Sequence, residues 1–320
     1  GLLVLGIIVS IIYAATAFGN GFKIPFLGIR AGSVLEEASK ELTQYNISVR
    51  FSPEEKKAYC QQQIDYINKE NVVLKELYFH LYPNAFRYEE KPVFPVEELS
   101  QAYPNGFSPG EIRFENIYTG NKTADFIIGG FSDDILKITL KEPLEPGQKV
   151  GIEMEYSITL PNSPGRFGYG ENTYNFGNWY PIICVYDDEG WNLDPYYSIG
   201  DPFYSDVANY IVEIIAPKEY IIAATGELVK QLDMGEKKSW SINARAVRDF
   251  AWIASNRFKV SEKKVGDTIV YSYYYTQEGG MQALDYAASS LEIFNTLFGK
   301  YPYSQLSVVQ SDFSIGGMEY

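Results

Sequence analysis

The sequence predicts a mainly β protein, with a sandwich-like or saddle-shaped antiparallel domain followed by the beginning of an α/β or α+β unit. Three observations lead to this expectation. Apolar residues alternate with polar ones in several short segments, and Tyr and Phe, which suit strands, occur 27 and 19 times. A long helical pattern of apolar residues appears near the end of the chain. The length of 320 residues allows two folded units.

The overall composition is that of a globular protein without a nucleic-acid partner. Hydrophobic residues make up 46% of the chain and charged residues 21%, so the chain has enough apolar surface to form a core. The formal net charge is −14, and no stripe of Lys and Arg is present. Because binding to phosphate groups depends on clustered basic side chains, we expect no nucleic-acid partner.

The amino-terminal residues 1–18 contain no charged side chain. This length is near the lower limit for a helix that crosses a bilayer, so we expect a transmembrane anchor. A signal peptide cleaved near residues 15–17 is the alternative, because Ala-Thr-Ala fits the small-residue pattern. The anchor would keep the chain at the membrane, and in both cases the remainder is expected to be exported, so that its folded part is extracytoplasmic. Residues 19–44 are predicted to be a linker with a short helix over 33–44.

A β-rich domain is predicted over residues 45–275. Its first two strands are expected at 47–51 and 58–68, joined as a hairpin by the turn at 52–55. The clearest strand runs from 150 to 160 and follows the turn Glu-Pro-Gly-Gln. Its alternating apolar residues are Val150, Ile152, Met154, Tyr156, Ile158 and Leu160. Further strands are expected at 136–140, 210–215, 239–246 and 268–275.

The segment 165–206 is irregular and dense in aromatic residues. Gly, Asn, Asp and Pro interrupt it throughout. A long irregular segment inside a compact domain is usually functional or unusually well packed. The rings are expected to form a loop core between two sheets, and a sugar-binding platform is the alternative.

The cysteine and histidine residues limit the chemistry that the chain can perform. His80 is the only histidine, so no two-histidine zinc motif can be assembled from these residues. Its apolar neighbours favour a structural role, with the ring nitrogens hydrogen-bonded. Cys60 and Cys184 are as well explained by two buried thiols as by a disulfide, and the sequence does not decide between them.

A change of pattern after residue 275 predicts a second unit over 276–320. One long amphipathic helix is expected there, with Gly299 at its C-cap and Pro302 preventing its continuation. A strand over 306–310 follows. The apolar positions of the helix are Met281, Leu284, Ala288, Leu291, Phe294 and Phe298.

The chain ends in GGMEY (316–320), which resembles the G-x-M-E-N signature of the alanyl aminopeptidase family of zinc metallopeptidases. Four upstream segments resemble a bacterial branch of this family and occur in the family's order. They are LKELYFHLYPNAF (74–86), NWYPIICVYDDEGW (178–191), GDPFYSDVANYIVEI (200–214) and RDFAWIASNRF (248–258). The similarity covers residues 45–320 and departs from the signature at Tyr320, where the family has Asn.

The resemblance implies a saddle-like β domain followed by a thermolysin-like catalytic domain that is incomplete in this sequence. In the family, two His of an H-E-x-x-H helix and a later Glu bind zinc, so the zinc ligands are expected downstream of Tyr320. The sequence shown is therefore expected to be the amino-terminal portion of a zinc aminopeptidase and to be inactive alone. A non-catalytic extracellular module that binds peptide or glycan is the alternative.

The resemblance also implies substrate-binding residues. Glu319 matches the carboxylate that holds the free α-ammonium of a peptide substrate. Gly316 and Gly317 match positions where the backbone approaches the substrate, and Met318 lies between them and Glu319. A second amine ligand is implied in the loop before Trp179, where the nearest residues are Glu171 and Asn172.

Overall fold

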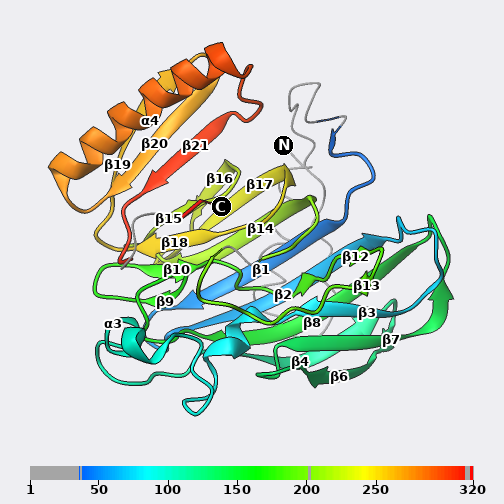
Figure 1. Ribbon diagram of the computed structural model, residues 1–320. Helices are drawn as coiled ribbons and strands as arrows, with labels where there is room; N and C mark the ends of the chain where they lie inside the picture. Colours follow the sequence, from blue (N-terminus) through cyan, green and yellow to red (C-terminus); the bar gives the residue numbers. More distant parts are fainter. Residues whose placement is uncertain (1–35, 37, 201–202, 314–317, 320) are drawn as a thin grey trace. The chain divides into compact units, whose positions relative to one another are not determined.

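The computed structural model describes residues 36, 38–200, 203–313, 318 and 319 (Figure 1). All of them belong to the unit formed by residues 32–320. Strands dominate, and the one long helix lies near the carboxyl end of the described part. The predicted mainly β fold with several antiparallel sheets is confirmed. The division into domains at residue 275 stays a prediction.

The largest sheet among the described residues has eight strands in the order β16-β17-β14-β1-β2-β8-β4-β5. Their bounds, in that order, are Glu227–Asp233, Lys237–Val247, Ala208–Pro217, Gln44–Ser52, Lys57–Ile67, Lys149–Thr159, Glu111–Thr119 and Lys122–Thr123.

Alternating side chains explain why these segments form strands with one buried face. Tyr45, Ile47, Val49 and Phe51 of β1 are each at most 3% exposed, while the residues between them are more exposed. The same alternation runs through β2, β8 and β14. β1 and β2 pair antiparallel around a turn at 53–56, one residue later than expected, so the predicted hairpin is confirmed.

One pairing differs from the antiparallel sheet that the sequence predicts. β1 and β14 run parallel, with Gln44 opposite Asn209 and Arg50 opposite Ile215. Parallel neighbours need a long connection, and most of the domain lies between these two strands in the sequence. Local alternation cannot reveal the direction of a partner so distant in the chain.

Two four-stranded sheets lie beside the large one. The first has the order β11-β3-β7-β6 and the second β15-β18-β10-β9, and a separate pair joins β12 to β13. The strands of the first sheet are, in that order, Ile182–Ile183, Leu74–His80, Ile135–Leu144 and Asp125–Gly129. Those of the second sheet are Ile221–Ala224, Trp252–Ser255, Tyr174–Phe176 and Phe167–Tyr169. The bounds of β12 and β13 are Tyr186–Asp187 and Gly190–Trp191.

The turn at 145–148 carries the chain from one sheet to another. β7 belongs to a four-stranded sheet and β8 to the eight-stranded sheet, so these consecutive strands do not pair. The sheets pack through buried aromatic rings. Phe51 of β1 lies edge-on to Phe176 and Trp252, with ring centroids 5.5 and 5.7 Å apart. One hydrophobic cluster extends through all three sheets.

The aromatic segment 165–206 contributes largely to this core. Phe176, Trp179 and Tyr180 are completely buried, and Phe176 stacks on Trp252 with ring centroids 3.7 Å apart. Tyr197 and Tyr204 are exposed by 53% and 43%. Most of the rings that could have formed a sugar-binding platform are therefore either buried or packed against the core, and the packing supports the loop-core interpretation.

The carboxyl-terminal part of the described chain combines a helix with a three-stranded sheet. Helix α4 (Gln277–Leu297) packs against β19 (Lys259–Val265) and β20 (Thr268–Tyr274), and β21 (Gln305–Val309) pairs parallel to β20 (Figure 1). Leu284, Ala288 and Leu291 are buried, whereas Phe294 and Phe298 are exposed by 54% and 80%. The predicted helix and strand are confirmed, but the helix buries only part of its predicted apolar face.

Short helices and the amino-terminal region complete the description. The 3-10 helices η1 (Tyr82–Phe86) and η2 (Val96–Glu98) precede the short helix α3 (Leu99–Ala102). The helix predicted over 33–44 is wrong in its second half, because residues 39–41 form a turn and β1 begins at residue 44. Burial of the ring of Tyr45 in the central strand outweighs helical propensity there. The segment 1–18 lies outside the described residues.

The two cysteines are free thiols. Cys60 and Cys184 are both buried and unpaired, which answers the question that the sequence left open. Burial raises the pKa of both thiols. They are therefore inert core residues.

His80 is a core residue whose ring lacks the hydrogen bonds expected from the sequence. It is 1% exposed, and neither ring nitrogen has a partner among the described atoms. The imidazole instead stacks on Tyr82, with ring centroids 4.7 Å apart. The packing supports the structural role, and no hydrogen bond to the ring is found among the described atoms, where Tyr82 provides aromatic contact.

We predict that His80 makes the stability of the fold depend on pH. Burial disfavours the imidazolium and lowers the pKa of His80 from 6.5 to about 4, and the charge of Asp194 opposes this shift. Between these values the unfolded chain binds a proton that the folded chain does not. The contribution of His80 to the free energy of unfolding is therefore fully present above pH 6.5. It is lost as the pH falls towards 4, which lowers the free energy of unfolding by on the order of 3 kcal/mol.

Urea unfolding of the wild type and His80→Phe at several pH values isolates this contribution, because the other titrating groups are shared. The single imidazole signal can also be followed directly by NMR. An imidazole that titrates near pH 6.5 in the folded protein would contradict the prediction.

Candidate functional site

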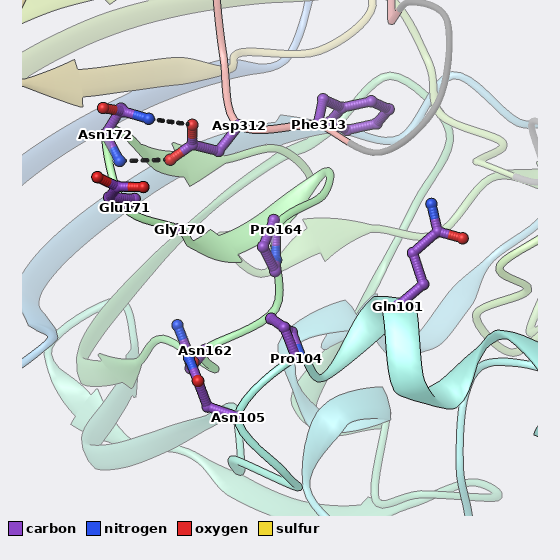
Figure 2. A pocket seen from close by; sticks show the side chains of 10 residues that line it. All are labelled: Gln101, Pro104, Asn105, Asn162, Pro164, Gly170, Glu171, Asn172, Asp312 and Phe313. Atoms are coloured by element: carbon purple, nitrogen blue, oxygen red, sulfur yellow. Dashed lines mark hydrogen bonds between the residues drawn. The ribbon is translucent and has the colours of Figure 1, made fainter.

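A cleft of about 660 Å³ lies where loops of the β domain meet the segment after β21 (Figure 2). Three parts of the β domain contribute: α3 with the loop after it, the loop before β9, and the turn between β9 and β10. The residues that line the cleft are Gln101, Pro104, Asn105, Asn162, Pro164, Gly170, Glu171, Asn172, Asp312 and Phe313.

The carboxylate of Asp312 joins the two sides of the cleft. Its Oδ1 accepts a hydrogen bond from Asn172 Nδ2 at 2.7 Å, and its Oδ2 accepts one from the backbone N–H of Asn172 (Figure 2). The backbone N–H of Thr173 also donates to Oδ2, at 3.1 Å. The hydroxyl of Tyr275 donates to Oδ1 at 3.1 Å. Burial, and after it the charge of Asp312, raises the pKa of Tyr275 to about 12, so the phenol keeps the proton that it donates.

The orientation of the Asn172 amide follows from the chemistry of its two partners. Asp312 can only accept hydrogen bonds, and the guanidinium of Arg257 can only donate them. The amide nitrogen therefore faces Asp312, and the amide oxygen accepts from Arg257 Nη1. The backbone oxygen of Asn172 accepts from Ser255 Oγ at 2.7 Å. Both ends of this side chain are already bound within the protein.

A second layer of hydrogen bonds ties the same two segments together. Thr173 Oγ1 accepts from the backbone N–H of Asp312 at 3.0 Å and lies 3.2 Å from Ser311 Oγ. Asn175 accepts from Ser311 Oγ at 2.9 Å and donates to the backbone oxygens of Gly165 and Asp312. A network in which every member is paired holds its geometry more firmly than isolated contacts do.

Gln310 extends the connection to the start of the helical unit. Its Oε1 accepts hydrogen bonds from the backbone N–H groups of Tyr275 and Thr276, both at 3.0 Å. Thr276 precedes the first residue of α4. The segment 310–313 thus contacts both the β domain and the α4 unit.

The sequence-predicted site residues differ in where the structure places them. Glu171 lines the cleft with its side chain 88% exposed, and its Oε1 lies 3.9 Å from Arg257 Nη1. Asn172 lines the same cleft but is fully engaged, as described above. Glu319 is exposed and Met318 is partly buried. Gly316 and Gly317 lie outside the described residues.

The residues that organise the cleft, Asp312 and Arg257, were not identified from the sequence. Asp312 stands seven positions before Glu319, and Arg257 lies at the end of a segment already matched to the family. Neither belongs to a short motif that indicates chemistry. Their partners are far away in the chain, so only the fold reveals the contact.

The part of the chain that the structure describes contains no arrangement for zinc. No group of three or more His, Cys, Asp or Glu side chains among these residues could hold a metal ion. His80, Cys60 and Cys184 are all buried in the β domain. The described residues therefore do not fit a zinc site.

Comparisons with known proteins give a consistent result at the level of the fold. No protein-family model and no curated protein sequence matches the chain. Solved structures do match. The M1 zinc metallopeptidase from Deinococcus radiodurans is 14% identical with a TM-score of 0.54, and a mutant of it is 15% identical with a TM-score of 0.55. The mutant bound to a Tyr-Ser-Ala substrate is 15% identical with a TM-score of 0.54.

These matches cover 84% of this chain but only 56% of the solved chains. The chain thus spans little more than half the length of the proteins that it resembles. At this level of identity the similarity establishes a shared fold, and it confirms the resemblance to the alanyl aminopeptidase family in that respect.

We predict that Gly170→Ala disrupts the junction at Asp312. A Cβ at position 170 would lie 2.5 Å from Asp312 Oδ2 and 2.7 Å from its Cβ, so the carboxylate would have to move. The expected loss is about 1–3 kcal/mol in the free energy of unfolding, measured in urea. Gly165→Ala is the matched control, since a Cβ there would meet no atom within 4 Å. Equal stability of the two variants would show that the contact is not tight.

Proposed function

We propose that this chain is the amino-terminal portion of a zinc-dependent aminopeptidase that removes amino-terminal residues from peptides. The fold shared with M1 zinc metallopeptidases and the sequence GGMEY support this proposal. The observation that carries it is the junction at Asp312. That junction joins the turn bearing Glu171 to the segment that leads into GGMEY.

The chemistry of the two glutamates suits the recognition of a free amino terminus. A carboxylate forms a charge-assisted hydrogen bond with an α-ammonium group, whereas an internal peptide nitrogen carries no charge to pair with. Glu319 is exposed, and Glu171 is exposed at the edge of the cleft. Asn172 is already bound to Asp312 and Arg257, so Glu171 is the better of the two amine ligands in this turn.

The ligands of the structural neighbours agree with this substrate class. One M1 structure holds a Tyr-Ser-Ala substrate, and another, with a TM-score of 0.51, holds L-arginine. Both ligands carry a free α-amino group. We therefore propose a peptide with a free amino terminus as the substrate.

Zinc is proposed for the whole protein rather than for the described residues. The neighbouring structures are zinc metallopeptidases, and the described part of this chain offers no metal site. In the proposal, the zinc ligands come from sequence that follows Tyr320. The residues described above would bind and orient the substrate's amino terminus.

Attachment to a membrane is a further part of the proposal. It rests on the uncharged residues 1–18, which would hold the folded part outside the cytoplasm. Within the described ranges, no helix is both long and apolar enough to span a bilayer. Residues 1–18 are not among those ranges.

We predict that a protein extended beyond Tyr320 through the expected H-E-x-x-H region binds one zinc ion and releases tyrosine from Tyr-Ser-Ala. The 320-residue chain is the control and should do neither. Metal content by mass spectrometry and amino-acid release by chromatography measure the two properties. An extended protein without zinc would refute the proposed metal dependence, and a zinc protein that left the peptide intact would refute aminopeptidase activity.

We also predict that Glu319→Ala and Glu171→Gln each lower kcat/KM of the extended protein for Tyr-Ser-Ala by about tenfold or more. The reason is the loss of a charge-assisted hydrogen bond to the substrate's ammonium group. Glu189→Gln, at another exposed glutamate, is the control and should leave the rate unchanged. Unchanged kinetics of either site variant would remove that residue from the site.

A further inference from the structure

The exposed carboxylate of Glu171 would have to lose conformational freedom in order to bind an amine. A glutamate side chain that is 88% exposed can adopt many rotamers, and the guanidinium of Arg257 lies as far as 3.9 Å from its carboxylate. Binding energy is lost whenever such a group must first be ordered. The backbone that carries Glu171 must therefore be held firmly by something else.

The structure shows what holds it. On one side of Glu171, the backbone N–H of Gly170 donates to the oxygen of Thr173 at 3.0 Å and closes the turn. On the other side, the next two backbone N–H groups, of Asn172 and Thr173, donate to Asp312. The turn is pinned from outside by one carboxylate, which the opposite side of the cleft supplies.

We infer that Asp312 is a positioning residue for substrate recognition, which acts by fixing the turn that presents Glu171 to the substrate's amino terminus. This inference rests on the proposed function and names a residue in addition to the two glutamates. Arg257 assists, because it fixes the amide of Asn172 from the opposite end. Asp312 does not itself contact the substrate.

The chemistry of the position favours aspartate over similar residues. Its two oxygens accept four hydrogen bonds: two from backbone N–H groups, one from the Asn172 amide and one from the Tyr275 hydroxyl. An asparagine would turn an NH₂ group towards some of these donors and leave them unpaired. A longer side chain would lack room, since Gly170 packs directly against Asp312.

The first test measures the turn itself in the 320-residue chain. Amide hydrogen exchange at Asn172 and Thr173 should be at least about tenfold faster in Asp312→Asn, because a neutral amide with one acceptor oxygen cannot serve all four donors and binds these N–H groups more weakly than the carboxylate does. Asp133→Asn is the matched control. Asp133 also accepts hydrogen bonds, from Arg87 and Tyr88, but these lie in a different loop. Unchanged protection at Asn172 and Thr173 in Asp312→Asn would overturn the inference.

Asn172→Ala provides a second variant in case Asp312→Asn does not fold. It removes only the side-chain bonds to Asp312 and Arg257. Exchange at the Thr173 amide should again be faster than in the wild type. Protection of the Thr173 amide equal to that in the wild type would contradict the proposed role of Asp312 in fixing the turn.

The second test measures whether Asp312 affects substrate binding through Glu171. In the extended protein, Asp312→Asn should raise KM for Tyr-Ser-Ala by about tenfold with a smaller change in kcat, as expected when binding geometry is lost. In a Glu171→Gln background the same substitution should add nothing, because the group that it positions is already gone. A purely structural role would instead give additive effects, and additivity would overturn the inference.

The two tests separate this inference from the proposed function. If Glu171→Gln raises KM but Asp312→Asn does not, only the positioning role fails. If Glu171→Gln leaves KM unchanged, the amine-binding role of Glu171 fails and the positioning role fails with it. A zinc-loaded extended protein that does not cleave Tyr-Ser-Ala would refute the proposed function itself.

Discussion

Burial of one face of the eight-stranded sheet is the constraint on which the rest of the structure depends. Strands β1, β2, β8 and β14 each place every second side chain in the core. The two smaller sheets cover that face and form one hydrophobic cluster with it. At roughly 25 cal/mol per Å² of apolar surface, burial on this scale outweighs local preferences such as the helical propensity before residue 44.

The same burial determines how polar groups behave inside the domain. Tyr180 donates a hydrogen bond to Asp249 at 2.8 Å, and its oxygen lies 2.9 Å from that of Tyr210. Asn178 donates to the other oxygen of Asp249 at 2.8 Å. Burial raises the pKa of Tyr180 and Tyr210, so these phenols stay protonated and serve as donors within the core. Burial likewise disfavours the charged form of His80, whose pKa it lowers.

The cleft lies between loops of this core and the segment that follows β21. The turn between β9 and β10 belongs to one of the small sheets. Asp312 follows β21 in the chain and accepts hydrogen bonds from this turn. Functional loops held by a rigid framework can keep a defined geometry without being buried themselves. Glu171 and Asn172 are adjacent, yet the first has an exposed side chain and the second is hydrogen-bonded to Asp312.

The sequence by itself determined the strand segments, the late amphipathic helix and the family whose fold the chain shares. Local periodicity and motifs of contiguous residues predict these features, as the alternation in 150–160 and the ending GGMEY do. The resemblance also pointed to Glu171 and Asn172 as candidates, and their role in binding stays a prediction. The parallel pairing of β1 with β14, the unpaired ring of His80 and the junction at Asp312 were decided only by the tertiary structure. Each depends on groups far apart in the chain, and no local pattern encodes which distant donor or acceptor, if any, will meet a side chain once the sheets have packed.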